Sequence, residues 1–456
     1  MESKTNHFYA GAASVDITPA MGTILGVDFV SHYARFIHDP LSAKAVVFRD
    51  ENEMIAIIIV DICIMGTDFM DDIKVRIQKQ VGIHPEKILL ASNHNHASGD
   101  VVGLLGGAAD ITYRNKLPDL IVRAVQLANE KLRLAKIAAG SVDVPDYVLC
   151  RRYLMKEGYI AKNPVTGKTD QVKTNPFGAE DLIEGPAAPT DPGLSFLAVK
   201  GIDEQWIAVL GNYSLHYVAD WHVDSVTADF FGEFSKQIKE KLNAAEDFVG
   251  IMSNGTSGDV NIWDFMNPDR FPKEDYAKTK LIGDALAQKV FESLSNVTWQ
   301  SNPAIAVQYE ELDLAVRKPS SQELESAIKT FVENDFNNLE INEESINRIY
   351  AREQVLLNKY PDTAVSPVQA IKIGSLIIGA LGGEFFAETG LLLKKSVANN
   401  NYFTICLANA YGGYIPPAHE MERGGYETWR ARSSLMEQGA EQKIREELLR
   451  LIQNFK

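Results

Sequence analysis

Short apolar, β-branched runs alternate along the chain with segments of helical periodicity. The runs at 43–48 and 54–60 predict two neighbouring strands that are joined by a polar turn. The segment 68–82 carries apolar residues at helical spacing and ends at a glycine, which predicts a helix. A strand over 87–92 and a second amphipathic helix over 117–135 follow. This alternation is typical of an α/β protein.

The alternation stops between residues 151 and 191, where the segment is rich in proline, glycine and polar residues. A loop of this length inside a compact domain is usually functional or mobile. Strands are predicted again at 194–200 and 206–215, followed by a helix over 233–245 and a strand over 248–253.

The last third of the chain begins with a Ser-x-x-Glu capping box at Ser320 and Glu323. It opens a predicted helix, which we expect to form a helical hairpin with the helical pattern that follows. The segment 368–383 alternates as a strand pair, and 402–409 is the last predicted strand. With no evident linker, the chain 1–456 is predicted to be a single domain with a mixed β-sheet core flanked by helical layers.

Composition narrows the possible partners and compartment. The formal charge of −16 argues against a nucleic-acid partner, and it disfavours stable association with an anionic membrane. The longest apolar run, at 55–65, is interrupted by Asp61 and predicts a buried strand rather than a membrane span. The first residues lack the apolar segment of a signal peptide, so we expect a soluble cytoplasmic protein, or an exported one whose leader has been removed.

Two histidines, His94 and His96, stand two positions apart where the strand 87–92 ends. Residues i and i+2 of an extended chain point to the same side. Loops at the carboxyl ends of strands are the usual ligand sites of open α/β sheets. The pair therefore indicates half of a metal site, and a polar turn with hydrogen-bonded histidines is the alternative interpretation.

A second cluster follows the strand at 206–215, where His216 precedes His222 and several aspartates. Two histidine ligands and a carboxylate suit zinc and leave a position open for water. His222 is open to three interpretations: a spare ligand, a substrate contact or an exposed side chain. In the glycine-rich stretch 253–261, Asp259 is a candidate for orienting a histidine, and a simple turn is the alternative. Glu384 follows a glycine pair at a strand end and is a candidate ligand.

Taken in order, these segments resemble the N-terminal catalytic domain of the neutral, non-lysosomal ceramidases. The resemblance covers most of the chain and keeps the order of the motifs. Because the sequence ends in a helical pattern, we expect no counterpart of the family's C-terminal immunoglobulin-like domain within it. The segments that carry the resemblance are AGAASVDITPAMG (10–22), SNHNHASGD (92–100), LHYVADWHVDSVTADFFGEF (215–234), SNGTSGDVN (253–261), GGEF (382–385) and GYIPPAHEMERGGYE (413–427).

The resemblance implies one zinc ion per chain and assigns roles around it. His96 becomes the histidine that transfers protons beside the metal, and Tyr426 and Arg151 become contacts of the developing oxyanion. Arg152 is the close alternative to Arg151, and with His222 and Asp259 it is assigned to substrate binding. The implied zinc ligands are His94, His216, Glu384 and Tyr414.

The chain departs from the family at Asn261, where the ceramidases carry their proposed nucleophilic serine. An amide cannot form an alkoxide, and the nearby hydroxyls of Thr256 and Ser257 are out of register. Asn261 is instead a candidate hydrogen-bond donor to the oxyanion, and water activated by the metal becomes the expected nucleophile.

These inferences lead to a zinc-dependent hydrolase that cleaves an amide, ester or lactone bond of a small soluble substrate, with sugar-derived compounds among the candidates. One alternative is a ceramidase-like amidase acting on N-acyl lipids. Another is a catalytically silent relative that only binds a ligand. The sequence does not indicate an oligomeric state.

Overall fold

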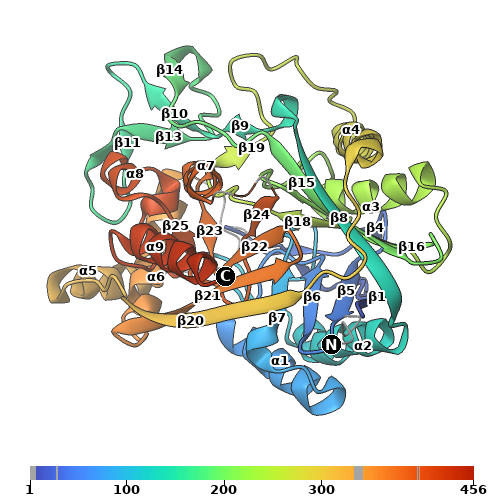
Figure 1. The fold of residues 1–456 in the computed structure, drawn as a ribbon. Helices are drawn as coiled ribbons and strands as arrows, with labels where there is room; N and C mark the ends of the chain where they lie inside the picture. Colours follow the sequence, from blue (N-terminus) through green and yellow to red (C-terminus); the bar gives the residue numbers. More distant parts are fainter. Residues whose placement is uncertain (1–6, 27–28, 333–341, 398, 400, 456) are drawn as a thin grey trace.

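The computed structural model describes residues 7–26, 29–332, 342–397, 399 and 401–455, which form helices and two stacked sheets (Figure 1). The larger sheet has eight strands and is mixed, since β6 pairs with β7 and β16 with β18 in parallel while the other neighbours are antiparallel. In spatial order its strands are β18 (Val249–Asn254), β16 (Trp206–Tyr213), β15 (Gly193–Gly201), β8 (Arg133–Asp143), β1 (Tyr9–Asp16), β5 (Ser42–Arg49), β6 (Met54–Val60) and β7 (Ile88–Ser92).

A four-stranded sheet packs against one face of the larger sheet. Apolar side chains of both sheets, such as Phe48 on β5 and Ile371 on the second sheet, share one buried cluster. Because successive strand residues point to opposite faces, Ala45 and Val47 of β5 point away from this cluster, toward the helices. The second sheet consists of β20 (Ile305–Ala315), β21 (Thr363–Ile373), β22 (Leu376–Leu381) and β24 (Tyr402–Ile405).

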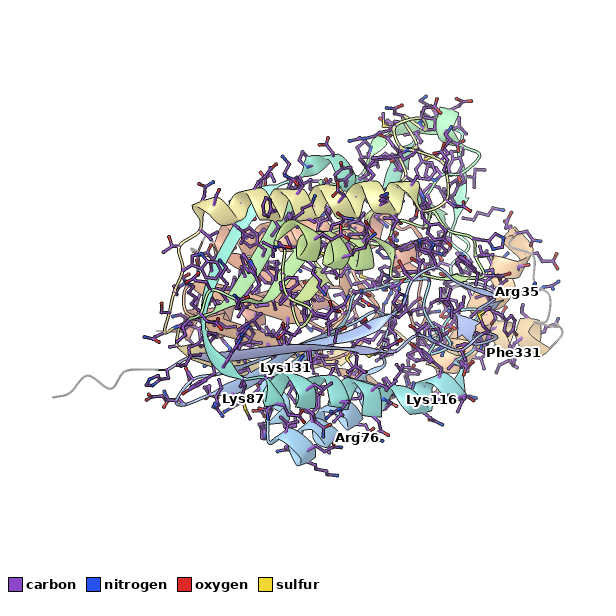
Figure 2. All side chains as sticks on the ribbon, turned by 90° about the vertical axis from the view of Figure 1, so that its right-hand side faces the viewer. Arg35, Arg76, Lys87, Lys116, Lys131 and Phe331 are labelled. Atoms are coloured by element: carbon purple, nitrogen blue, oxygen red, sulfur yellow. The ribbon has the colours of Figure 1, made fainter. Side chains whose placement is uncertain are left out.

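Helices cover both outer faces of the stacked sheets. The outer face of the larger sheet carries α1 (Thr67–Val81), α2 (Ile111–Glu130), α3 (Asp229–Lys241) and α4 (Ala277–Ser293). Figure 2 shows α1 beside α2, with Arg76 on the former and Lys116 and Lys131 near the two ends of the latter. The outer face of the smaller sheet carries α7 (Ala387–Ser396) and α9 (Ala440–Gln453). The predicted architecture, a mixed sheet core between helical layers, is confirmed.

Most predicted elements are found, and the differences have local causes. The second helix was predicted over 117–135 from its amphipathic pattern. It begins at Ile111 instead, since the Asp110 carboxylate caps it by accepting from the Tyr113 amide. The helix α4 was not predicted, and the residue before it, Tyr276, supplies no capping side chain.

The long segment after Arg151 contains short strands, although the sequence showed little periodicity there. Three of them form a small sheet at the top of the molecule in Figure 1. The sheet consists of β10 (Arg152–Met155), β13 (Val172–Thr174) and β14 (Ile183–Pro186), and a separate pair consists of β11 (Ala161–Lys162) and β12 (Thr169–Asp170).

Short pairs and helices complete the chain. The capping box is confirmed, because the Ser320 amide donates to Glu323 and the Glu323 amide donates to the Ser320 hydroxyl. It begins α5 (Ser321–Val332), which contacts α6 (Glu343–Leu357) as the predicted hairpin requires. The residues that connect the two helices, 333–341, lie outside the described residues. The paired strands are β2 (Ile24–Leu25) with β3 (His32–Tyr33), β4 (Phe36–Ile37) with β17 (Ser225–Val226), β9 (Leu149–Cys150) with β19 (Val260–Asn261), and β23 (Glu384–Phe385) with β25 (Tyr414–Ile415). The remaining helices are α5 (Ser321–Val332), α6 (Glu343–Leu357) and α8 (Ala418–Arg423), and the 3₁₀ turns are η1 (Pro85–Lys87), η2 (Pro145–Tyr147), η3 (Glu180–Leu182), η4 (Leu294–Asn296) and η5 (Tyr426–Thr428).

Among the described residues, no helix has both the length and the apolar character needed to cross a bilayer.

Candidate metal centre

The ends of strands from both sheets meet at one buried point. His94 follows the end of β7 at Ser92, and His216 follows the end of β16 at Tyr213. Glu384 follows the end of β22 and begins the short strand β23. One ligand atom from each of these three side chains lies within 4.8 Å of the others, and all three residues are buried. The topology therefore brings three of the predicted zinc ligands together.

The asparagines on either side of His94 hold its turn in place. The Asn93 amide group donates to the Asp61 carboxylate at 2.7 Å, and the Asn95 amide group donates to the Thr227 carbonyl at 2.8 Å. The Asn95 side-chain oxygen also accepts from the Ala97 amide. His94 itself has a φ of 71°, an uncommon left-handed conformation that these contacts stabilise. The polar residues in this turn thus fix the direction of the imidazole.

Each of the two buried histidines directs its Nε2 atom toward the same point. The Nδ1 atom of His94 lies 3.0 Å from the Cys63 carbonyl, and that of His216 lies 3.1 Å from the Ser257 carbonyl. A carbonyl only accepts, so Nδ1 carries the proton in both rings and Nε2 carries the lone pair. The two Nε2 atoms lie 2.8 Å apart. Two lone pairs at this distance repel each other. The Arg151 guanidinium, with a terminal nitrogen 3.3 Å from His216 Nε2, reduces this repulsion, and a metal ion bound by both nitrogens would remove it.

The carboxylate of Glu384 completes this electron-rich group. Its Oε1 accepts from the Tyr411 hydroxyl at 3.1 Å, and its Oε2 lies 3.2 Å from His94 Nε2 and 3.8 Å from His216 Nε2. Oε2 is buried and has no hydrogen-bond donor among the described residues. A buried carboxylate oxygen without a donor is costly unless a cation satisfies it. The donor set of two imidazoles and a carboxylate fits zinc.

A second group, Cys63 with His94 and His96, also has the composition of a metal site. The Cys63 thiol lies 3.6 Å from His94 Nδ1, but the Cys63 carbonyl occupies that nitrogen at 3.0 Å. Because His94 Nδ1 donates to this carbonyl, it is not free to bind an ion. The group around Glu384 is therefore the better candidate.

Tyr414, the fourth predicted ligand, lies next to this group. The short strands β23 and β25 pair in parallel and place Tyr414 opposite Glu384. The Arg151 guanidinium carbon lies 5.4 Å from the centre of the Tyr414 ring. Burial, with the Glu384 carboxylate adding to it, raises the pKa of the Tyr414 hydroxyl well above its ordinary value.

His96 lies beside the three-residue group without belonging to it. Its Nε2 atom is 3.3 Å from His94 Nε2, and its ring stacks on Tyr217 with the ring centres 3.9 Å apart. Burial, together with the neighbouring His94 and Arg151, lowers the pKa of His96 well below its ordinary value. His96 is therefore a neutral imidazole at the edge of the candidate metal centre.

The two adjacent arginines point in different directions. Arg151 directs one terminal nitrogen to 3.3 Å from His216 Nε2 and donates to the Gly258 carbonyl and to Glu427. Arg152 is fully buried and donates to Glu427, Glu420 and the Gly424 carbonyl. Arg151 therefore faces the histidines, whereas the hydrogen bonds of the Arg152 guanidinium go to the 420–427 segment.

Tyr426 lies close to Tyr414, with the two ring centres 5.6 Å apart. The Asn261 amide group donates to the Asn175 side chain at 2.6 Å, and its oxygen accepts from the Trp263 amide. Asn261 thereby connects two loops near the centre.

Two other predicted residues lie in different surroundings. Asp259 is fully buried and accepts from the Ala387 amide at the start of α7, which is a structural contact. His222 is exposed on a turn and accepts from the Asp224 amide at 3.4 Å.

Two residues near the centre were missed from the sequence. Tyr411 belongs to the same glycine-rich loop as Tyr414, and only its contact with Glu384 distinguishes it. Glu427 follows Tyr426 directly and binds both arginines. Because its partners lie more than 270 positions away along the chain, no local pattern indicated this role.

Comparisons with known proteins give a structural match and no sequence match. No family model matches the chain, and no curated protein matches it. A neutral ceramidase from Pseudomonas aeruginosa superposes with a TM-score of 0.72 at 15% identity, over 98% of this chain and 74% of that one. A structure described as ceramidase complexed with C2 gives a TM-score of 0.71 at 14% identity, over 98% of this chain and 75% of the other. The chain therefore has, over almost all of its described length, the fold of the neutral ceramidase structures.

Proposed function

We propose that this protein is a zinc-dependent hydrolase that cleaves an amide, ester or lactone bond of a small soluble substrate, with water activated by the metal as the nucleophile. The observation that carries the proposal is the convergence of two Nε2 lone pairs with the donor-free Oε2 of Glu384. His94, His216 and Glu384 would hold the ion, and Tyr414 is the candidate for a fourth ligand. Sugar-derived substrates are included in the proposed class.

The surrounding side chains supply the remaining steps of such a hydrolysis. A zinc ion at this point provides Lewis-acid activation of water and of the substrate carbonyl. Neutral His96 accepts a proton from the attacking water and returns it to the leaving group. Arg151 stabilises the negative charge that develops on the carbonyl oxygen, and the Tyr426 hydroxyl would add a second hydrogen bond.

Water is the proposed nucleophile because the nearby hydroxyls are occupied elsewhere. Asn261 carries no hydroxyl, and its amide is bonded to Asn175 and Trp263. Ser257 is buried and donates to Asn254 at 2.7 Å. Thr256 is also buried, where it packs against Gly390.

A second candidate function is amide hydrolysis of N-acyl lipids, which the likeness to the ceramidase structures favours. A third is ligand binding without catalysis, and Asn261 in place of a serine favours it. Turnover of a short amide distinguishes the proposed hydrolase from both alternatives. A protein that only binds a ligand hydrolyses no substrate, and a lipid amidase requires a substrate with a long chain.

The experiment is a screen of short amides, esters and lactones, and of N-acyl lipids, with the purified protein before and after treatment with a zinc chelator. We expect a short substrate to be cleaved, the activity to disappear with the metal and to return with added zinc. The His94→Ala variant should be inactive, while His222→Ala, which alters an exposed histidine, should retain activity. Activity that survives complete removal of zinc would refute the proposal.

A further inference from the structure

A continuous series of aromatic rings leads from the candidate metal centre to the protein surface. It begins at Tyr217, whose ring stacks on His96 at 3.9 Å between centres. The next ring is Trp263, 6.2 Å from Tyr217, and the last is Phe177, 5.3 Å from Trp263. We call Tyr217, Trp263 and Phe177 the aromatic strip.

Three separate segments contribute to the aromatic strip, and each has a structural link to the centre. Tyr217 follows the candidate ligand His216 directly. Trp263 and Phe177 each stand two positions after an asparagine, and these two asparagines, Asn261 and Asn175, are hydrogen-bonded to each other. In addition, the backbone amide of Asn175 donates to the backbone carbonyl of Arg151. The outer part of the strip is therefore tied to the backbone of the arginine that faces the histidines.

The outer end of the aromatic strip is open to solvent. Phe177 is 65% exposed, although its ring also contacts Phe265 at 4.8 Å. Single exposed apolar residues are common on protein surfaces and need no explanation. Phe177 differs because it is the exposed member of a series of ring contacts that starts at the candidate catalytic histidine. Ligand sites typically combine such aromatic walls with a few polar groups.

The polar group beside the strip restricts what it can bind. Asn175 is partly exposed and lies two residues from Phe177. An alkyl chain lying on the strip would cover this amide without offering it a hydrogen bond, which is unfavourable. A sugar ring has apolar C–H faces that can lie on aromatic rings and a rim of hydroxyl groups that can pair with an amide. The combination therefore favours a sugar ring over an alkyl chain.

We propose that the aromatic strip is the subsite for the sugar ring of a sugar-derived substrate, whose scissile acyl bond lies at His94 and His216. This inference rests on the proposed function, and it adds the substrate class and the residues that select it. Phe177 is the outermost contact of the sugar ring, and Trp263 provides the central face.

The test compares two acetamides that differ in the group on nitrogen. N-acetylglucosamine carries a sugar ring, and N-hexylacetamide carries an acyclic chain of six carbons. Binding of each is measured by tryptophan fluorescence, which needs no turnover, and cleavage by the release of free amine. One variant is Phe177→Ala, which alters an exposed side chain and should therefore leave the fold intact. The other is Trp263→Phe. The matched control is Phe291→Ala, which removes a 40% exposed phenylalanine from α4.

We expect the protein to bind N-acetylglucosamine in preference to N-hexylacetamide. Phe177→Ala should weaken the binding of the sugar by about tenfold and leave that of the alkyl amide unchanged, in line with the loss of one aromatic contact. Phe291→Ala should bind both as the wild type does. Binding of the sugar without cleavage would support the subsite and count against the proposed hydrolysis. Absence of sugar binding, or binding that Phe177→Ala does not weaken, would overturn the subsite, whether or not short amides are cleaved.

Discussion

The Nε2 atoms of His94 and His216 face each other at 2.8 Å, although the two residues lie 122 positions apart in the chain. Their Nδ1 atoms donate to backbone carbonyls on opposite sides, so neither ring can turn its protonated nitrogen toward the other without losing a buried hydrogen bond. The fold thus holds two imidazole lone pairs together beside the Glu384 carboxylate. The proposed zinc ion would neutralise this electron-rich group, and the predictions below follow from that proposal.

Removal of the Tyr411 hydroxyl should weaken metal binding. It donates to Glu384 Oε1 and so orients the carboxylate whose other oxygen faces the histidines. Loss of such an orienting hydrogen bond typically lowers metal affinity by about ten- to a hundredfold. Tyr411→Phe should therefore require more free zinc for half-saturation in a competition titration with a chromophoric chelator. The control is Tyr402→Phe, another buried tyrosine, whose hydroxyl pairs with Thr404. Equal zinc affinities of the two variants would contradict the assignment of Glu384 as a ligand.

Glu427 should control turnover through Arg151. Its carboxylate accepts from Arg151 and Arg152 at 2.8 Å each. Although burial favours the neutral acid, the two guanidinium groups keep the pKa of Glu427 below its ordinary value. Glu427→Gln removes the charge that orients Arg151, and we expect kcat to fall by about ten- to a hundredfold at unchanged zinc content.

The control for this prediction is Glu420→Gln, which removes a buried carboxylate that binds Arg152 and Arg423 but has no recorded contact with Arg151. Its melting temperature should fall as much as that of Glu427→Gln, while kcat changes less. If both variants lower kcat equally at temperatures well below their melting points, Glu427 has only a structural role.

Asp259 should make the stability of the protein depend on pH. Burial raises the pKa of its carboxyl from the ordinary value of 3.8 to about 7. Between these values the folded protein holds a proton that the unfolded chain has lost, so stability decreases as pH rises from about 4 to about 7 and is then constant. Asp259→Asn keeps an oxygen that can accept from the Ala387 amide and cannot ionise.

The Asn variant should therefore gain stability relative to the wild type as pH rises, by at most about 4 kcal/mol at pH 8. Urea unfolding at pH 5 and pH 8 measures this difference, and Asp247→Asn, which alters an exposed aspartate, serves as the control. A wild-type to Asp259→Asn difference that stays constant between the two pH values would show that the carboxyl titrates normally.

The layered fold could be predicted because its strands and helices have strong local patterns. Strand β6, for example, has seven consecutive apolar residues, and α1 ends at Gly82 in the left-handed conformation. The helix α4 was missed because it has no capping side chain, and its packing against α3 depends on residues distant in sequence. Local pattern alone does not contain that information.

In the candidate site, too, only the residues with a local sequence pattern could be predicted. His94 and His216 stood out because each follows a strand end, and a strand end is visible in the sequence. In contrast, the different directions of Arg151 and Arg152 could not be predicted, because the two residues are adjacent and equally basic. Only the folded structure brings His216 to Arg151 and Glu420 to Arg152. The hydrogen bond between Asn175 and Asn261 is likewise a contact between distant loops that no spacing rule anticipates.

Zinc content tests the central claim most directly. Protein purified without added chelator and dialysed against metal-free buffer is analysed by inductively coupled plasma mass spectrometry, for the wild type and for the variants His94→Ala, His216→Ala and His222→Ala. We predict about one zinc ion per chain for the wild type and for His222→Ala, and much less than one for the other two. A wild-type protein that cannot be loaded with zinc, or His94→Ala and His216→Ala variants that retain one ion per chain, would contradict the account.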